Sequence, residues 1–205
     1  MSVASVLGVA DLPDGVLDAL EEQYRTPIDR YYHTFDHAMN VALVAEKYPL
    51  WADRQAAILA ALYHDAVYEP GNPENEFLSA ALLHSHMRER CPPLTLYRAE
   101  KLIVLTAHHF TLSRYELNED DCAFLDCDLA GLAAPWADFV EQNRNIDAEF
   151  LSIHSHDEVL SGRRKFLQGM LDRPRIFSSK FGHSRYEDLA RANIKRALEE
   201  LYPQE

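Results

Sequence analysis

An alanine-rich stretch, ADRQAAILAALYHDAV at residues 52–67, decides the fold. Its apolar residues recur three and four positions apart, which predicts a helix over about Ala52–Val67. Small side chains at Ala56, Ala57, Ala60 and Ala61 would let a neighbouring helix come close. Most other segments show the same spacing, and alternating runs rich in Val or Ile are absent, so we expect an all-α protein.

The 205 residues favour one globular domain, a helical bundle of about nine helices. No repeat and no linker divides the chain. We expect a core of about residues 30–132, on which C-terminal helices from 136 to 202 pack. With Asp14 as a cap for the first helix, the predicted helices are Val16–Arg25, Asp36–Tyr48, Ala52–Val67, Glu74–Arg90, Leu94–Phe110, Asp121–Leu132, Trp136–Ser152, Asp157–Leu171 and Tyr186–Tyr202.

Composition limits the environment and the partners. The net charge of −13 would repel a polyanion, so nucleic-acid binding is disfavoured. Cys91, Cys122 and Cys127 form an odd set with no paired spacing, which favours a reducing, cytoplasmic setting. No signal peptide and no run of eighteen uncharged apolar residues is present, so no membrane partner is expected. The composition leaves a homo-oligomer open.

Two histidines fall at matching heights on neighbouring predicted helices. His37 lies twelve residues before Pro49, and His64 lies thirteen after Trp51. If the two helices are antiparallel, both rings stand roughly 18 to 20 Å from the turn. Each shares an apolar face with small or aliphatic residues, so the rings should point between the helices. A lone histidine there is usually a hydrogen-bonded core residue, but two facing imidazoles beside Asp65 indicate a metal site.

The same residues carry a resemblance. HAMNVA at His37, YHDAVY at His64 and Asp65, and FLDCDLAGLA around Asp128 resemble the H…HD…D signature of the HD superfamily of metal-dependent phosphohydrolases. The further segments GRRKFLQGML (162–171) and EDLARANIKRAL (187–198) are similar to stand-alone members of about this length. The resemblance implies an HD-type helical domain with His37, His64, Asp65 and Asp128 as metal ligands. It also implies nucleotides or other small phosphorylated metabolites as substrates.

Other polar residues are candidates around that site. Asp126, two positions before Asp128, should point to another side, where it orients a ligand, caps a turn or is merely solvated. His33 precedes the helix of His37 and could touch substrate or be structural. Glu76 could orient water, or could simply favour the start of its helix. His108 and His109 could contact substrate, and the resemblance would let such histidines hold a second metal.

The predicted reaction is hydrolysis of a phosphate ester or anhydride. One divalent ion of Mn, Fe, Co, Ni or Zn, with a second left open, would activate water, and Asp65 could also orient that water. Ten Lys or Arg stand against three Asp or Glu between Ser161 and Arg196. This segment is either a solvated helix face or a positive rim near an anionic substrate. Arg163 and Lys180 are the candidates for binding the phosphate.

Two other functions compete with hydrolysis. A few members of the HD superfamily hold two irons and activate oxygen, so a di-iron oxygenase is one alternative. A metal-stabilised nucleotide-binding module without catalysis is the other. Turnover of a phosphate ester would separate both from the hydrolase.

Overall fold

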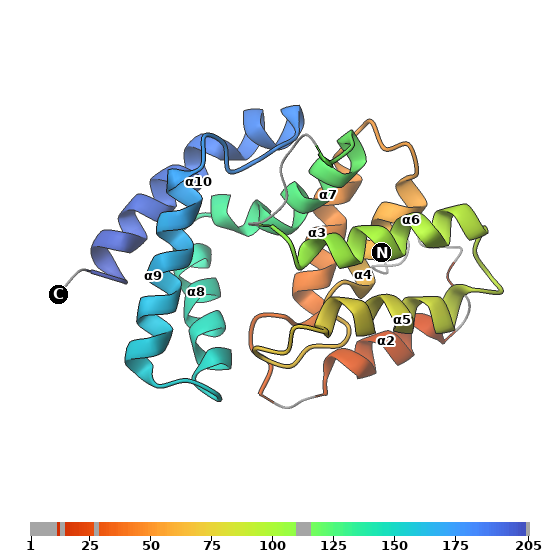
Figure 1. The fold of residues 1–205 in the computed structure, drawn as a ribbon, viewed down its shortest axis with the longest axis horizontal. Coiled ribbons are helices and arrows are strands. Elements are labelled where there is room, and N and C mark those ends of the chain that lie inside the picture. Colours follow the sequence, from red (N-terminus) through yellow and green to blue (C-terminus); the bar gives the residue numbers. More distant parts are fainter. Residues whose placement is uncertain (1–11, 13–14, 27–28, 110–115, 204–205) are drawn as a thin grey trace.

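The computed structural model describes residue 12 and residues 15–26, 29–109 and 116–203, and within them it is all-α, without strands. The prediction of the fold class is therefore confirmed. A short 3-10 helix, η2 (Ala130–Ala133), follows α7 (Figure 1). The α-helices are α2 (Val16–Tyr24), α3 (Phe35–Glu46), α4 (Arg54–Tyr63), α5 (Asn75–Met87), α6 (Pro93–Thr106), α7 (Glu119–Leu129), α8 (Trp136–Phe150), α9 (His156–Asp172) and α10 (Lys180–Glu200).

Helix α4 is the centre of the first hydrophobic core. Every residue from Ala56 to Tyr63 is buried, as expected for a helix that is apolar all round. Helices α3, α5, α6 and α7 pack against it, and its alanines admit α3 closely, as predicted. Asp53 begins the helix by accepting a hydrogen bond from the N–H of Ala56 at 3.0 Å.

A second hydrophobic core lies beside the first. It is built from α8, α9, α10 and η2 around Phe139, Leu167 and Phe177. In Figure 1 these C-terminal helices form the left half of the molecule, and α2 to α7 form the right half. Cys127 belongs to the first core and Leu129 packs on the second, so the end of α7 is the boundary.

Two helix boundaries differ from the prediction in ways that matter. Helix α4 ends at Tyr63, before the His64–Asp65 pair, and α10 begins at Lys180, six residues earlier than predicted. The side chain of Ser179 explains the earlier start, because it accepts a hydrogen bond from the N–H of Gly182 at 2.9 Å. The predicted cap Asp14 lies outside the described residues, and Gly15 in a left-handed conformation precedes α2.

Asp126 joins the two cores. Its buried carboxylate accepts hydrogen bonds from the N–H groups of Ser178 and Ser179 at 2.7 and 2.8 Å, and from the Ser179 hydroxyl at 2.6 Å. Gly182 lies so close that an added Cβ would collide with the same carboxylate. Of the alternatives for Asp126, the capping of a turn agrees with this geometry, whereas a solvated carboxylate does not.

The cysteines and the helices of the described residues bear on the environment expected for this protein. Cys91, Cys122 and Cys127 are all buried and form no disulfide among the described residues. Within the same part of the chain, none of the helices combines the length and the apolar character needed to cross a membrane.

Replacing Asp126 by Asn should destabilise the protein by about 2 to 4 kcal/mol, because an amide nitrogen would face buried N–H donors. The midpoint of thermal unfolding measures this. Ser178→Ala is the matched control, since only the backbone N–H of Ser178 binds the carboxylate, and it should unfold within about 0.5 kcal/mol of the wild type. Equal stability of Asp126→Asn and wild type would contradict the proposed link.

Candidate metal centre

Four side chains from three helical segments converge beside the first core. His37 comes from the first turn of α3, His64 and Asp65 follow α4 directly, and Asp128 comes from the last turn of α7. The Nε2 atoms of His37 and His64 are 3.2 Å apart. The two rings face each other at the same height, as the spacing from the turn predicts.

The end of α4 explains how two consecutive residues reach one point. Neighbours on a helix project about 100° apart, but the chain leaves the helix at His64. The guanidinium of Arg30 donates to the carbonyl of Asp65. The hydroxyl of Ser79 binds both the N–H and the carbonyl of Val67, at 3.0 and 3.1 Å. These bonds replace the helical ones and hold the Asp65 carboxylate 2.9 Å from His64 Nε2.

The separations of the ligand atoms fit a single transition-metal ion. Asp128 Oδ1 lies 3.2 Å from His37 Nε2 and 3.4 Å from His64 Nε2, and Asp65 Oδ2 lies 3.5 Å from His37 Nε2. Ligands at roughly 2.0 to 2.2 Å from an ion stand about 3.0 to 3.5 Å apart in octahedral or tetrahedral geometry. The ligand atoms of His37, His64 and Asp65 also fit within 4.8 Å of one another. Two imidazoles and two carboxylates suit Mn, Fe, Co, Ni or Zn.

The protonation of His64 favours a cation at this point. Its Nδ1 lies 2.9 Å from the carbonyl of Ala61, so this nitrogen carries a proton and Nε2 is the ring nitrogen directed at His37, Asp65 and Asp128. Burial lowers the pKa of His64, but the carboxylates of Asp65 and Asp128 outweigh burial and raise it well above its ordinary value. Burial raises the pKa of each carboxyl, and His64 lowers both below their ordinary range. Negative charge here requires a positive partner, either protons or a metal.

His109 supports Asp128, one of the candidate metal ligands. Its Nε2 lies 2.8 Å from Asp128 Oδ2, the oxygen that faces away from the other ligands. An ionised carboxylate only accepts, so this nitrogen donates and fixes the carboxylate. Asp126 is bonded to the start of α10 instead, which agrees with the prediction that the two aspartates point to different sides.

Glu149 on α8 fixes the segment that leads into α3. Its fully buried carboxylate accepts from the N–H groups of Tyr31, Tyr32 and His33 at 2.8, 2.7 and 3.0 Å. It also lies 2.6 Å from His33 Nδ1 and 3.2 Å from the hydroxyl of Tyr68. The rings of His33 and Tyr68 stack, with centroids 4.1 Å apart. His33 is therefore held in place beside the metal ligands, at the wall of a cavity.

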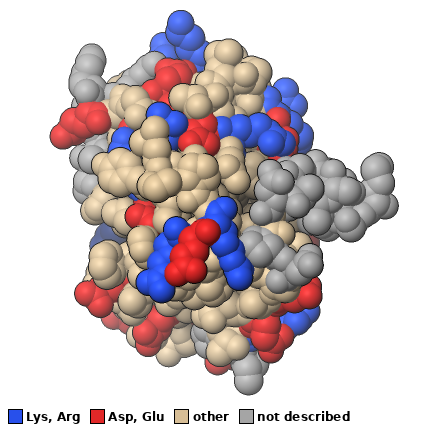
Figure 2. Space-filling model, turned by 90° about the vertical axis from the view of Figure 1, so that its right-hand side faces the viewer, with Lys and Arg blue, Asp and Glu red and all other residues tan. Residues whose placement is uncertain are grey.

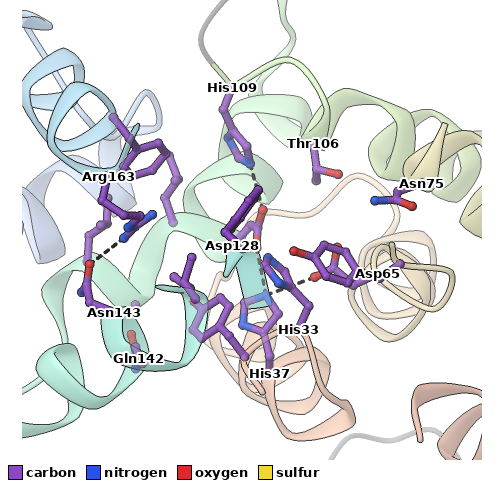
Figure 3. A pocket seen from close by; sticks show the side chains of 18 of the residues that line it. His33, His37, Asp65, Asn75, Thr106, His109, Asp128, Gln142, Asn143 and Arg163 are labelled. Atoms are coloured by element: carbon purple, nitrogen blue, oxygen red, sulfur yellow. Dashed lines mark hydrogen bonds and ion pairs between the residues drawn. The ribbon is translucent and has the colours of Figure 1, made fainter. Parts of the chain in front are cut away.

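That cavity, of about 390 Å³, lies between the two cores and includes three of the candidate metal ligands, His37, Asp65 and Asp128 (Figure 3). His33, Glu76, His109 and Arg163 also line it, so four of the other predicted site residues are brought together. His108 and Lys180 are exposed and are not among the described lining residues. Burial raises the pKa of the half-buried Glu76, with a smaller contribution from the charge of Asp65.

The basic segment of residues 161–196 divides its charges among several roles. Arg164 and Arg173 donate to backbone carbonyls, the second to that of His109 at 2.9 Å. Arg191 pairs with Glu187 at 2.7 Å and also donates to two carbonyls. Arg163 is the one cation of this segment that lines the cavity. Neither a solvated face nor a positive rim describes the whole segment.

Sequence reasoning missed several residues that shape the site. Glu149, Arg30 and Tyr68 act through partners 35 to 118 positions away, and no local pattern marks them. Asn143, which accepts a hydrogen bond from Arg163 at 2.5 Å, was missed for the same reason. A buried acid in an otherwise amphipathic helix is the only sign that Glu149 offers.

The purified protein should bind one equivalent of a transition metal, and Asp128→Asn or His64→Ala should lose most of it. Because binding energy contributes to folding energy, chelation should also lower the unfolding temperature of the wild type. Metal analysis by mass spectrometry checks the first point and thermal unfolding the second. Asp126→Asn is the matched control and should keep its metal. Equal metal loss from both aspartate variants would refute the ligand assignment.

Replacing Glu149 by Gln should lower the free energy of unfolding at pH 7 by about 3 kcal/mol. Burial raises the pKa of Glu149, but His33 and the backbone N–H groups outweigh it and bring the pKa below its ordinary value. The carboxylate therefore stabilises the fold above its ordinary pKa, and this contribution disappears as the pH falls through the lower folded value. Urea unfolding between pH 7 and pH 3 should show less acid destabilisation in the variant. Glu141→Gln, exposed on the same helix, should follow the wild type.

No protein-family model matches this chain, and neither a curated protein nor a solved structure does. Any function assigned to it therefore depends on the geometry of the ligand cluster and of the cavity beside it.

Proposed function

We propose that the protein is a metal-dependent hydrolase of phosphate esters or anhydrides in small metabolites. The observation that carries this proposal is the convergence of two imidazole nitrogens and two carboxylate oxygens at 2.9 to 3.5 Å, on the wall of an open cavity. A divalent ion held there would activate water and polarise a phosphoryl oxygen. The resemblance to the HD superfamily, noted on the same four residues, supports the same chemistry.

Side chains around the cluster have separate tasks in this proposal. Asp65 holds the ion and orients the attacking water. Glu76, which lines the cavity and whose pKa burial raises above its ordinary value, accepts a proton from that water. His33, fixed through Nδ1 by Glu149, presents its other ring nitrogen to the cavity and donates to a phosphoryl oxygen or to the leaving group.

The dimensions and charge of the molecule favour a small substrate. A cavity of about 390 Å³ is in the range of sites that enclose a metabolite. On the face seen in Figure 2, acidic and basic side chains are interspersed among other residues, without a continuous basic surface in its described part. The net charge of −13 also disfavours a polyanionic partner.

We favour one ion over two. His109 donates Nε2 to Asp128, so this nitrogen is not a lone-pair ligand for a second metal. That geometry also weighs against the di-iron oxygenase. A binding module would keep the same ligands and would differ from the hydrolase only in lacking turnover. An assay for phosphate release distinguishes the two.

Metal-loaded protein should release inorganic phosphate from at least one member of a panel of nucleotides, sugar phosphates and phosphorylated acids, assayed with Mn, Fe, Co, Ni and Zn. Asp128→Asn should lose this activity together with the metal. Glu76→Gln should retain the metal and lose about 100-fold in kcat, the usual range for a missing proton acceptor. Phosphate release that survives in metal-free Asp128→Asn would refute metal-dependent hydrolysis, and a complete absence of turnover would favour the binding module.

A further inference from the structure

The wall of the cavity opposite the metal ligands contains a largely buried cation. Figure 3 shows Arg163 on α9 and Asn143 on α8, across the cavity from His37 and Asp65, with the guanidinium directed inward. The side chain of Arg163 is 11% exposed. Among the described lining residues it is the only Lys or Arg.

The contacts of Arg163 hold it at that wall. One Nη atom donates to Asn143 Oδ1 at 2.5 Å, and the guanidinium lies over the ring of Phe166, 4.9 Å from its centroid. Asn143 is itself buried and donates to the carbonyl of Phe139 at 2.7 Å. A guanidinium fixed between an amide and a ring on α8 and α9 is preorganised to bind a group that arrives from the cavity.

The charge of Arg163 is only partly compensated. Asp147 Oδ1 lies 3.6 Å from Arg163 Nε, too far for a hydrogen bond, and both atoms are buried without a hydrogen-bond partner in the described structure. The other oxygen of Asp147 accepts from the hydroxyl of Tyr202 at 2.8 Å. Asp147 does not line the cavity, so an incoming group meets the arginine first. The exposed side of this cation therefore suits an anion.

We propose that the substrate carries a second anionic group, a carboxylate or a second phosphate, which binds Arg163 while the reacting phosphate lies at the metal centre. This inference rests on the proposed hydrolase function and specifies its substrate class. Phe139, Ile146 and Phe150 line the cavity on the α8 side, which favours a short carbon skeleton between the two charged ends. Arg163 is thus a specificity residue, distinct from the groups that contact the reacting phosphate.

Matched pairs of open-chain phosphates test the inference. Each pair combines an aldonic acid of three to six carbons, phosphorylated on its terminal carbon, with the corresponding alditol phosphate, which has CH2OH in place of the carboxylate. An alditol bisphosphate of each length tests the second phosphate. For at least one chain length, kcat/KM of the wild type should be at least 30-fold higher for a compound with two anionic groups than for the alditol monophosphate, whose other end is uncharged.

Arg163→Met should reduce that preference to less than threefold, mainly by lowering kcat/KM for the compound with two anionic groups. Arg163→Lys should keep part of the preference, because a point charge replaces the bidentate group. Lys165→Met, exposed on the same helix, is the control and should match the wild type. The inference is overturned if no length shows a preference, if Arg163→Met retains it, or if this variant loses activity equally on both partners, which would place Arg163 on the reacting phosphate.

Binding measurements keep this test independent of turnover. If none of these compounds is hydrolysed, the hydrolase proposal fails for them, yet calorimetry with Mn-loaded protein still compares the Kd values of each pair. The compound with two anionic groups should bind more tightly than its alditol phosphate, and Arg163→Met but not Lys165→Met should lose this difference. That result would support the anion site at Arg163 without supporting hydrolysis. Equal Kd values for both partners in the wild type would overturn it.

Discussion

Helices α3, α4 and α7 bring four electron-rich atoms together, Nε2 of His37 and of His64 and one carboxylate oxygen each of Asp65 and Asp128, and their mutual repulsion must be balanced by protons or by a cation. The Nε2 atoms of His37 and His64 lie 3.2 Å apart. Nδ1 of His64 donates to a carbonyl, and without an ion the charge of the two carboxylates is balanced by protons on the imidazoles, in agreement with the raised pKa of His64. In the proposed function a divalent ion would take the place of those protons, and metal binding and the packing of α3, α4 and α7 would then stabilise each other.

Two further buried carboxylates determine where the second core lies relative to this centre. Glu149 reaches from α8 to the backbone of residues 31–33, and Asp126 reaches from α7 to the start of α10. Each accepts several N–H groups that would otherwise be buried without partners. One link extends from the second core to the segment before α3, and the other extends from α7 to the second core. Together they fix α8 and α9, and with them Asn143 and Arg163, across the cavity from the candidate metal ligands.

The sequence predicted the features that depend on periodicity and missed those that depend on distant partners. The all-α fold and the facing of His37 and His64 followed from spacing alone, because both are properties of helices and short turns. The end of α4 at Tyr63 did not, since Arg30 and Ser79 supply the hydrogen bonds that end it. The early start of α10 likewise depends on Asp126, some fifty residues away. Glu149 resembled any surface acid of an amphipathic helix until its partners were visible.

The charge balance of the cavity connects these features to the choice of substrate. In the proposed metal centre the carboxylates of Asp65 and Asp128 would neutralise a divalent ion, so the centre by itself would contribute little net positive charge. Glu76 adds a further acid, although burial favours its protonated form. An anionic metabolite entering a protein of net charge −13 therefore needs a cation outside the ligand set. Most of the described arginines of the basic segment are engaged with backbone carbonyls or acids, and Arg163 is the one whose guanidinium faces the cavity. If Arg163 binds the second anionic group of the substrate as proposed, the position of that single residue, rather than the overall charge of its segment, selects the anions that the site holds.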